Sequence, residues 1–478
     1  MKLNNIRNSF VYLFFLFFIL AATYTILNKG PWIDEGYSLY YGANNLSLKQ
    51  KFFDVWVLDV HPPLFSFINY MVNNLYSIDV IIGRFLNFIP FIILLIYIFP
   101  KKETHDFKKI SIISAIIFLS TPEVFTSFVN YRSYFTANVF FLILSLSLLK
   151  VYKSNEIKRY DLFWLFLSFF ICVNIHYIYA FISCITFLVF FISFVLDKSY
   201  IKAKILFFTG ILSVIPVFIF LYIQKSYIES THNNFWIETS ALGAIKTFIV
   251  LEIKDFIIPS FILILLSIIF FFKKYFFENF KLFLILWISI ILSSFFLLLI
   301  NYIQPMVVSR YVTGIAILST LSIISLIYEK IDKRIISLVI LFSTILVLKL
   351  SYSNSKILGW NTFQNDFKLL VSSCPSSKIY PFYSYNGEHF RSIKEQNNMI
   401  NTYDNLYKYV ADHNHFKIQP INDPSSKPYT GSCPNIIWLE HKVLKENEIK
   451  SVLNNFRTCN IEIKSTDGSN YAKVTSCK

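Results

Sequence analysis

The residues best suited to chemistry gather in two short stretches near the start of the chain. GPWIDEGYSLYYG contains the acidic pair Asp34 and Glu35, directly after a long apolar run, and DVHPPLF contains Asp59 and His61. Carboxylates and imidazoles are the groups that most often accept or donate a proton during a reaction. An acidic pair after an apolar run can also be a solvated loop, but the second stretch nearby favours a functional site.

Two prolines follow the histidine and restrict the geometry of the second stretch. Pro62 and Pro63 fix φ, and proline is favoured in the first turn of a helix. We therefore expect a helix to begin there and to hold Asp59 and His61 in a set geometry. Together with Glu35, this pair could bind a divalent metal, since carboxylate and imidazole ligands suit zinc, magnesium or manganese. The cofactor is left open at this point.

Composition places these residues in an integral membrane protein. The chain has 55% hydrophobic residues, 15% charged residues and 53 phenylalanines among 478 positions, far from the make-up of a soluble domain. Apolar runs of about 18–20 residues, the length a helix needs to cross a bilayer, recur until about residue 351. We expect about eleven membrane spans, near 10–27, 79–99, 110–128, 133–151, 161–178, 180–197, 205–223, 257–272, 282–300, 311–328 and 335–351.

Basic residues predict the orientation of the bundle. Lysines and arginines gather after every second span, and loops of this kind usually face the cytoplasm. With an odd number of spans and the N-terminus inside, the loop 28–78 and everything after residue 352 would lie on the periplasmic side of the inner membrane. The net charge of +15 is then mostly a matter of topology, which argues against a nucleic-acid partner.

The chain divides into a membrane domain, 1–352, and a small extracytoplasmic α/β domain, 353–478. In the second domain the composition shifts to serine, asparagine, lysine and tyrosine, with β-like runs at KIYPFYSY and NIIWLEH and a helical pattern at LKENEIKSVLNNF. Asp467 and Gly468 lie between two further β-like runs and predict a hairpin. The first domain carries the loop with interfacial helices, 28–78.

Four cysteines in the second domain suggest disulfide bonds, since that domain is expected to face an oxidising compartment. In the predicted hairpin Cys459 and Cys477 arrive nearly opposite each other, within the Cα separation that a disulfide tolerates. The remaining two, Cys374 and Cys433, each precede a proline and a β-like run. We expect the bonds Cys459–Cys477 and Cys374–Cys433, with free thiols as the alternative.

The two polar stretches together resemble a known family. An outer loop with an Asp-Glu pair and an Asp-Val-His-Pro-Pro-Leu sequence is similar to that of the GT-C glycosyltransferases, in particular protein O-mannosyltransferases and lipid A aminoarabinose transferases. The likeness continues through GRFLNFIPF, STPEVFTSFVNYRSYF, NIHYIYA and SRYVTGIAIL, and covers residues 1–350 in order. It implies a mainly α, polytopic helical bundle of the GT-C type, whereas the tail matches no motif.

The resemblance also implies an activity. Such enzymes transfer a sugar, hexosyl or pentosyl, from a polyprenyl-phosphate donor to an acceptor on the outer face, with inversion at the sugar carbon. One carboxylate must take the acceptor proton, and Asp34 is the candidate, with Glu35 beside it. The acceptor, whether glycan, lipid or protein, is not implied. A transporter or flippase of lipid-linked sugars is the alternative, although transporters keep their polar residues near the bilayer midplane.

Arginines at the outer ends of spans are candidates for holding the donor phosphate. A guanidinium group matches phosphate oxygens with two parallel hydrogen bonds, and cations aimed at a leaving group stabilise its developing charge. We assign this role to Arg132 and Arg310, with His176 and Arg84 as further candidates. Arginines that extend to lipid headgroups, and a buried, hydrogen-bonded His176, are the alternatives.

Overall fold

The structure is a computed structural model, and it describes residues 2–59, 61–100, 105–231, 239–271, 280–383, 392–421, 433–439, 459–465 and 470–477. The chain forms two compact units, each described by itself below. The helical unit consists of Met1–Ile26, Trp56–Phe67 and Arg84–Ser353. The loop–tail unit consists of Leu27–Val55, Ile68–Gly83 and Asn354–Lys478. By contact, most of the first loop therefore groups with the tail.

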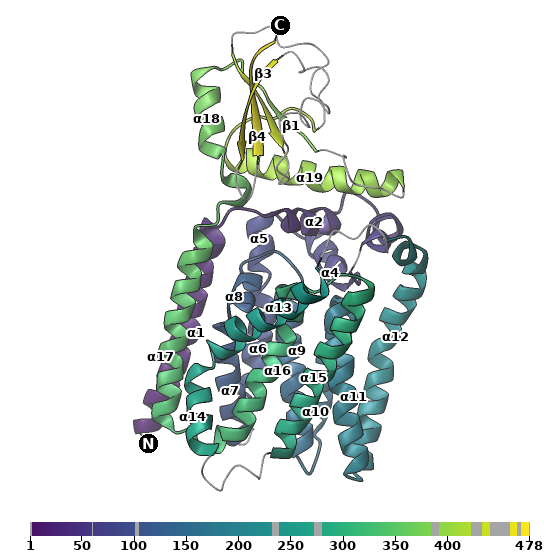
Figure 1. Ribbon diagram of the computed structural model, residues 1–478, viewed down its shortest axis with the longest axis vertical. Helices are drawn as coiled ribbons and strands as arrows, with labels where there is room; N and C mark the ends of the chain where they lie inside the picture. Colours follow the sequence, from purple (N-terminus) through teal and green to yellow (C-terminus); the bar gives the residue numbers. More distant parts are fainter. Residues whose placement is uncertain are drawn as a thin grey trace. The chain divides into compact units, whose positions relative to one another are not determined.

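Most of the helical unit consists of long apolar helices that run alongside one another (Figure 1). Its helical segments, some of which extend at one end into the loop–tail unit, are α1 (Lys2–Asn28), α5 (Val80–Phe85), α6 (Phe88–Ile98), α7 (His105–Leu119), α8 (Pro122–Phe128), α9 (Tyr134–Lys153), α10 (Arg159–Ile175), α11 (Tyr177–Leu196), α12 (Tyr200–Thr231), α13 (Ala241–Leu251), the π-helical η3 (Glu252–Ile257), α14 (Phe261–Phe271), α15 (Phe280–Ile303), α16 (Ser309–Ile327) and α17 (Lys333–Ser355). In α9 and α16, 89% of the apolar window is buried, so these two form the centre of the bundle.

Among the described residues, eight helices are long and apolar enough to cross a membrane, or nine if one bent pair counts as a span. The sequence predicted about eleven. Two predicted spans, 161–178 and 257–272, correspond to α10, which has 17 residues, and to α14, of which the structure describes 11 residues, and neither is among these eight helices. The polytopic helical bundle itself is confirmed.

The span predicted at 110–128 is not one straight helix in the structure. It consists of α7 and α8, which meet at an angle of 76°. Thr121 is extended, with φ −76° and ψ 140°, and Pro122 occupies the first turn of α8. Proline has no N–H to donate and disfavours helical geometry in the residue before it, so the Thr-Pro pair breaks the helix.

The loop–tail unit contains a four-stranded sheet in the order β1-β2-β4-β3. Its strands are β1 (Ile379–Pro381), β2 (Asn435–Leu439), β3 (Cys459–Ser465) and β4 (Asn470–Cys477). β1 runs parallel to β2, whereas β4 is antiparallel to both β2 and β3. The predicted hairpin is confirmed, because β3 and β4 pair with Cys459 opposite Cys477. The predicted helix in LKENEIKSVLNNF lies outside the described residues.

Two helices of the tail accompany the sheet, α18 (Gln364–Ser373) and α19 (Ile393–His413) (Figure 1). Their buried faces meet an aromatic core that includes Trp360, Phe367, Tyr407 and Trp438. A disulfide joins Cys374 to Cys433, with a Cα–Cα distance of 5.6 Å, as the sequence analysis predicted.

The first loop supplies α2 (Ile33–Gly42), α3 (Leu48–Gln50), the π-helical η1 (Lys51–Val55), the 3-10 helix η2 (Trp56–Leu58) and α4 (Leu64–Asn73). α2 lies along α19 (Figure 1). At the contact a Cβ on Gly36 would come within 3.3 Å of the carbonyl oxygen of Thr402, so the absence of a side chain allows this close approach. The acidic pair is thus held on a helix that packs against the tail.

Candidate active site

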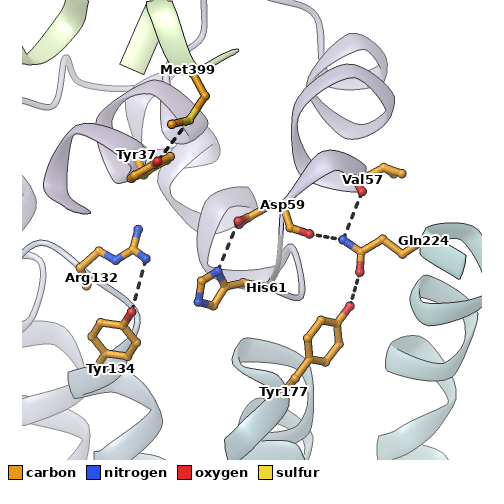
Figure 2. A network of polar contacts seen from close by, with 9 residues as sticks. All are labelled: Tyr37, Val57, Asp59, His61, Arg132, Tyr134, Tyr177, Gln224 and Met399. Atoms are coloured by element: carbon orange, nitrogen blue, oxygen red, sulfur yellow. Dashed lines mark hydrogen bonds and ion pairs between the residues drawn. The ribbon is translucent and has the colours of Figure 1, made fainter. Parts of the chain in front are cut away.

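Asp59 and His61 form a pair that the helical unit holds in place. His61 Nδ1 lies 3.3 Å from Asp59 Oδ1. From α12, the Gln224 amide donates hydrogen bonds to the backbone carbonyls of Val57, at 3.2 Å, and Asp59, and Tyr177 at the start of α11 donates to Gln224 at 2.5 Å (Figure 2). Residues of α11 and α12 therefore fix the backbone that carries Asp59 and His61.

The two prolines act as the sequence predicted. α4 begins at Leu64, directly after Pro62 and Pro63, and the Pro63 carbonyl accepts the first helical hydrogen bond from the Phe67 N–H at 2.8 Å. Sequence reasoning missed Gln224, which is fully buried in the apolar α12. A buried amide within a span is a rare and usually meaningful feature, so its residue type was the available signal.

His176 occupies the break between α10 and α11. Its Nδ1 accepts a hydrogen bond from the Ile178 N–H at 3.2 Å and so caps α11. Because Nδ1 accepts, a neutral ring must carry its proton on Nε2. Nε2 is buried and has no hydrogen-bond partner among the described residues. The ring therefore offers one N–H donor to a ligand, while the ring centroids of His61 and Tyr311 both lie 4.9 Å away.

The structure brings the two predicted phosphate-binding arginines to one aromatic ring. The guanidinium carbon of Arg132 lies 5.5 Å from the ring centroid of Tyr134, and that of Arg310 lies 5.6 Å from the same centroid. Arg132 also donates to the Tyr134 hydroxyl at 3.4 Å (Figure 2). Tyr134 in turn packs against His176, with 5.5 Å between the ring centroids. A cation–π arrangement of this kind helps to hold both guanidinium groups beside the ring.

Arg84 has a different environment. It is 1% exposed at the end of α5, and its Nη1 donates to the backbone carbonyl of Ile26 at 3.1 Å. This contact ties α5 to α1. The contact favours a structural role for Arg84, and its assignment as a phosphate ligand stays a prediction.

Asp34 and Glu35 lie in the first turn of α2, in the loop–tail unit. Glu35 is fully buried, and its Oε2 accepts a hydrogen bond from the Trp32 N–H at 3.0 Å, which caps the helix. Negative charge in the first turn is also favoured by the helix dipole. Glu35 thus positions α2, whereas Asp34 is partly exposed on it.

The chain enters α2 through a tight backbone contact with the tail. The Gly30 N–H donates to the Ile357 carbonyl at 2.8 Å, and the Trp360 N–H donates to the Pro31 carbonyl at 3.0 Å. A Cβ on Gly30 would lie 1.6 Å from the Leu358 carbonyl oxygen, so a larger residue requires the backbone to move. The glycine and proline of GPWIDE thereby fix the position from which Asp34 projects within this unit.

Lys51 is a further buried charge that sequence reasoning missed. Its Nζ donates to the Tyr40 carbonyl at 2.6 Å and lies 4.4 Å from the centroid of the Tyr40 ring. Burial lowers the pKa of Lys51 from 10.5 to about 8, because desolvation penalises the charged form. The lysine sits at the start of η1, on the loop that carries the acidic pair.

The architecture matches solved structures. ArnT from Cupriavidus metallidurans bound to undecaprenyl phosphate aligns with a TM-score of 0.56 and 10% sequence identity, over 98% of this chain and 98% of that one. The apo state of ArnT aligns with a TM-score of 0.53 and 9% identity, again over 98% of each chain. The chain has the ArnT fold. No family model and no curated protein matches its sequence.

The ArnT fold confirms the fold expected from the resemblance to GT-C glycosyltransferases. At such low identity it confirms the architecture alone, so the roles of individual residues depend on the geometry described above. Within the part of the chain that the structure describes, no three His, Cys, Asp or Glu side chains are grouped as a metal site.

Proposed function

We propose that this protein is an inverting glycosyltransferase that moves a hexosyl or pentosyl group from a polyprenyl-phosphate donor to an envelope glycan, lipid or protein. One observation carries the proposal: Arg132, Arg310 and the Nε2–H of His176 surround Tyr134 in a fold shared with ArnT, which was solved with undecaprenyl phosphate bound. Two guanidinium groups and one neutral donor form a set suited to a phosphate ester.

In the proposed reaction Asp34 accepts the proton of the acceptor nucleophile, which attacks the anomeric carbon of the donor. The new bond to the sugar forms as the bond from the sugar to the phosphate oxygen breaks from the opposite face. The polyprenyl phosphate leaves as an anion, and Arg132 and Arg310 stabilise the charge that develops on it. Glu35 keeps α2, and hence Asp34, in position.

The lysine-rich loops between the spans support a periplasmic location for this reaction, as the positive-inside rule predicts. Asp59 and His61 would then face the donor from the first loop, with Gln224 and Tyr177 fixing their backbone. We assign to this pair the orientation of the donor headgroup.

Donor binding tests the proposal. We expect purified Arg132→Ala and Arg310→Ala each to bind undecaprenyl phosphate at least about tenfold more weakly than wild type, since a charge-assisted contact contributes about 1.5–3 kcal/mol. Arg132→Lys should recover affinity only in part, because lysine offers a point charge in place of a fork. Arg334→Ala, an exposed arginine of α17, is the matched control and should bind normally.

Binding can be measured by native mass spectrometry in nanodiscs, with unfolding midpoints recorded for each variant. Unchanged affinity in both alanine variants would contradict the phosphate site. Movement of a lipid-linked sugar across proteoliposomes, with no sugar transferred, would instead favour the transporter alternative.

A further inference from the structure

Three acidic side chains of the helical unit have no role in the transfer reaction described above. Glu123 lies in the first turn of α8, and Glu252 and Asp255 lie in η3. Acidic residues are rare inside membrane bundles and usually have a partner there. In this chain each of the three accepts a hydrogen bond from another element, so together they connect α8, η3 and α16.

Asp255 fixes the start of α8. Thr121, the N-cap residue of this helix, makes no capping hydrogen bond with its side chain. The cap comes instead from η3, because Asp255 Oδ1 accepts a hydrogen bond from the Glu123 N–H at 3.2 Å. Asp255 is 1% exposed, and a carboxylate beside the first N–H groups of a helix is also favoured by the helix dipole. η3 therefore holds the turn that carries Glu123.

Glu123 in turn holds the start of α16. Its Oε1 accepts a hydrogen bond from the Ser309 hydroxyl at 2.8 Å. Ser309 is the first residue of α16, and the apolar side chain of the N-cap residue before it, Val308, cannot cap the helix. Arg310, one of the two arginines assigned to the donor phosphate, is the next residue. The Glu123–Ser309 contact therefore fixes the backbone directly before Arg310.

We propose that Glu123 is a positioning residue for donor binding, which sets the position of Arg310 through Ser309. This role rests on the proposed function, since it requires that Arg310 holds the donor phosphate. Two parallel hydrogen bonds from a guanidinium group to a phosphate depend on distance and angle, so a small displacement of the Arg310 backbone weakens both of them.

The hydrogen bond of Glu123, and not its charge, supports binding in this account. A negative charge close to Arg310 would by itself disfavour an anionic ligand. Positioning and charge therefore predict opposite effects when the side chain of Glu123 is replaced by an apolar one. Positioning predicts weaker donor binding, whereas an effect of charge alone predicts tighter binding.

A second serine of α16 provides a matched comparison. Ser319 donates to Glu252 at 3.2 Å, a contact of the same chemical type that ties η3 to the middle of the helix. Ser319 lies well beyond Arg310 along α16. Removal of its hydroxyl group therefore breaks a serine–carboxylate hydrogen bond without releasing the start of the helix.

The test is the affinity of the purified full chain for undecaprenyl phosphate in nanodiscs, recorded together with the unfolding midpoint of each variant. We expect Ser309→Ala and Glu123→Leu each to weaken binding about fivefold, the effect of one lost hydrogen bond. Glu123→Gln keeps an acceptor oxygen and should bind at least as tightly as the wild type. Ser319→Ala, the matched control, should leave the affinity unchanged.

A double-mutant cycle with Arg310 provides a readout that a merely structural role would not change. If Glu123 acts through Arg310, Glu123→Leu should have no further effect on affinity in the Arg310→Ala background, whereas general destabilisation would weaken binding in both backgrounds.

Unchanged affinity in both Ser309→Ala and Glu123→Leu would overturn the positioning role. So would equal losses in Ser309→Ala and Ser319→Ala, or tighter binding by Glu123→Leu. Normal binding by Arg310→Ala would contradict the phosphate site of the proposed function itself, and the positioning role with it.

Discussion

His176 shows how one side chain can hold a structural and a binding role at once. The sequence left two interpretations of this residue open, a buried hydrogen-bonded histidine or a ligand-binding one. In the structure Nδ1 caps α11 through the Ile178 N–H, while Nε2 carries a proton with no partner among the described residues. The two nitrogens therefore divide the two roles between them.

Two substitutions separate these roles. His176→Asn places an acceptor near the position of Nδ1 but removes the ε donor, so we expect a nearly normal unfolding midpoint and weaker binding of undecaprenyl phosphate. His176→Gln keeps a donor near the position of Nε2 but loses the cap, which should lower the free energy of unfolding by about 1 kcal/mol and largely retain binding. Equal loss of affinity in both variants, measured alongside their unfolding midpoints, would show that Nε2 is not the decisive atom.

At the scale of elements, the helix that carries Asp34 is positioned by contacts with the tail. Gly359 has a φ of +50°, a left-handed conformation that favours glycine, and a Cβ there would lie 2.2 Å from the Pro31 carbonyl oxygen. On the other side of the loop, the Asn398 side chain of α19 accepts from Tyr40 at 2.9 Å and donates to the Asp54 carbonyl at 2.7 Å. The first loop and the tail therefore pack together within the loop–tail unit.

The buried Lys51 makes the stability of the loop–tail unit depend on pH. Below about pH 8 the lysine is charged in both the folded and the unfolded chain, and burial of that charge lowers the free energy of unfolding. Between about pH 8 and 10.5 the folded protein loses the proton first, so stability rises with pH, by about 3 kcal/mol at most.

We therefore expect the unfolding midpoint of the loop–tail unit to increase from pH 7.5 to 10 relative to Lys51→Met, in which this increase should be absent. Lys49→Met, two residues earlier and exposed, is the control and should follow the wild type. A wild-type profile that coincides with that of Lys51→Met would mean that Lys51 titrates normally.

At the scale of the whole molecule, the Cys374–Cys433 disulfide closes a long loop within the loop–tail unit. The two cysteines are 59 residues apart, and in the chain-entropy model a loop of this length stabilises the folded state by about 4 kcal/mol. Cys374→Ser with Cys433→Ser should lower the unfolding midpoint of this unit, followed by the fluorescence of its buried Trp360 and Trp438. Cys184→Ser removes a free cysteine of α11 and should have little effect, and equal midpoints in all three proteins would contradict the expectation.

The sequence predicted those features that depend on neighbours in the chain. The Asp59–His61 pair, the helix start after Pro63 and the β3–β4 hairpin are set by short-range geometry, and all three are present. The bend at Thr121 could also have been predicted, because a Thr-Pro pair disfavours a continuous helix.

Contacts between segments that are distant in the chain could not be predicted from the sequence pattern. Arg132 and Arg310 are far apart in sequence. Their position at the outer ends of predicted spans suggested a shared role, but not that both would lie beside the Tyr134 ring. The packing of α2 on α19 depends on which partner an amphipathic helix finds, and periodicity does not encode that choice. Likewise, the burial of Lys51 follows from tertiary packing, since an exposed lysine was equally compatible with the pattern of its segment.

The central claim, glycosyl transfer with Asp34 as the base, is tested most directly by mass spectrometry of envelope glycans, lipids and glycoproteins from a deletion strain. Complementation with the wild type should restore a sugar modification that the deletion removes. Asp34→Asn at equal expression and with an unchanged unfolding midpoint should restore it at least about 100-fold less, the usual contribution of a general base. Wild-type levels of the modification with Asp34→Asn would contradict the claim.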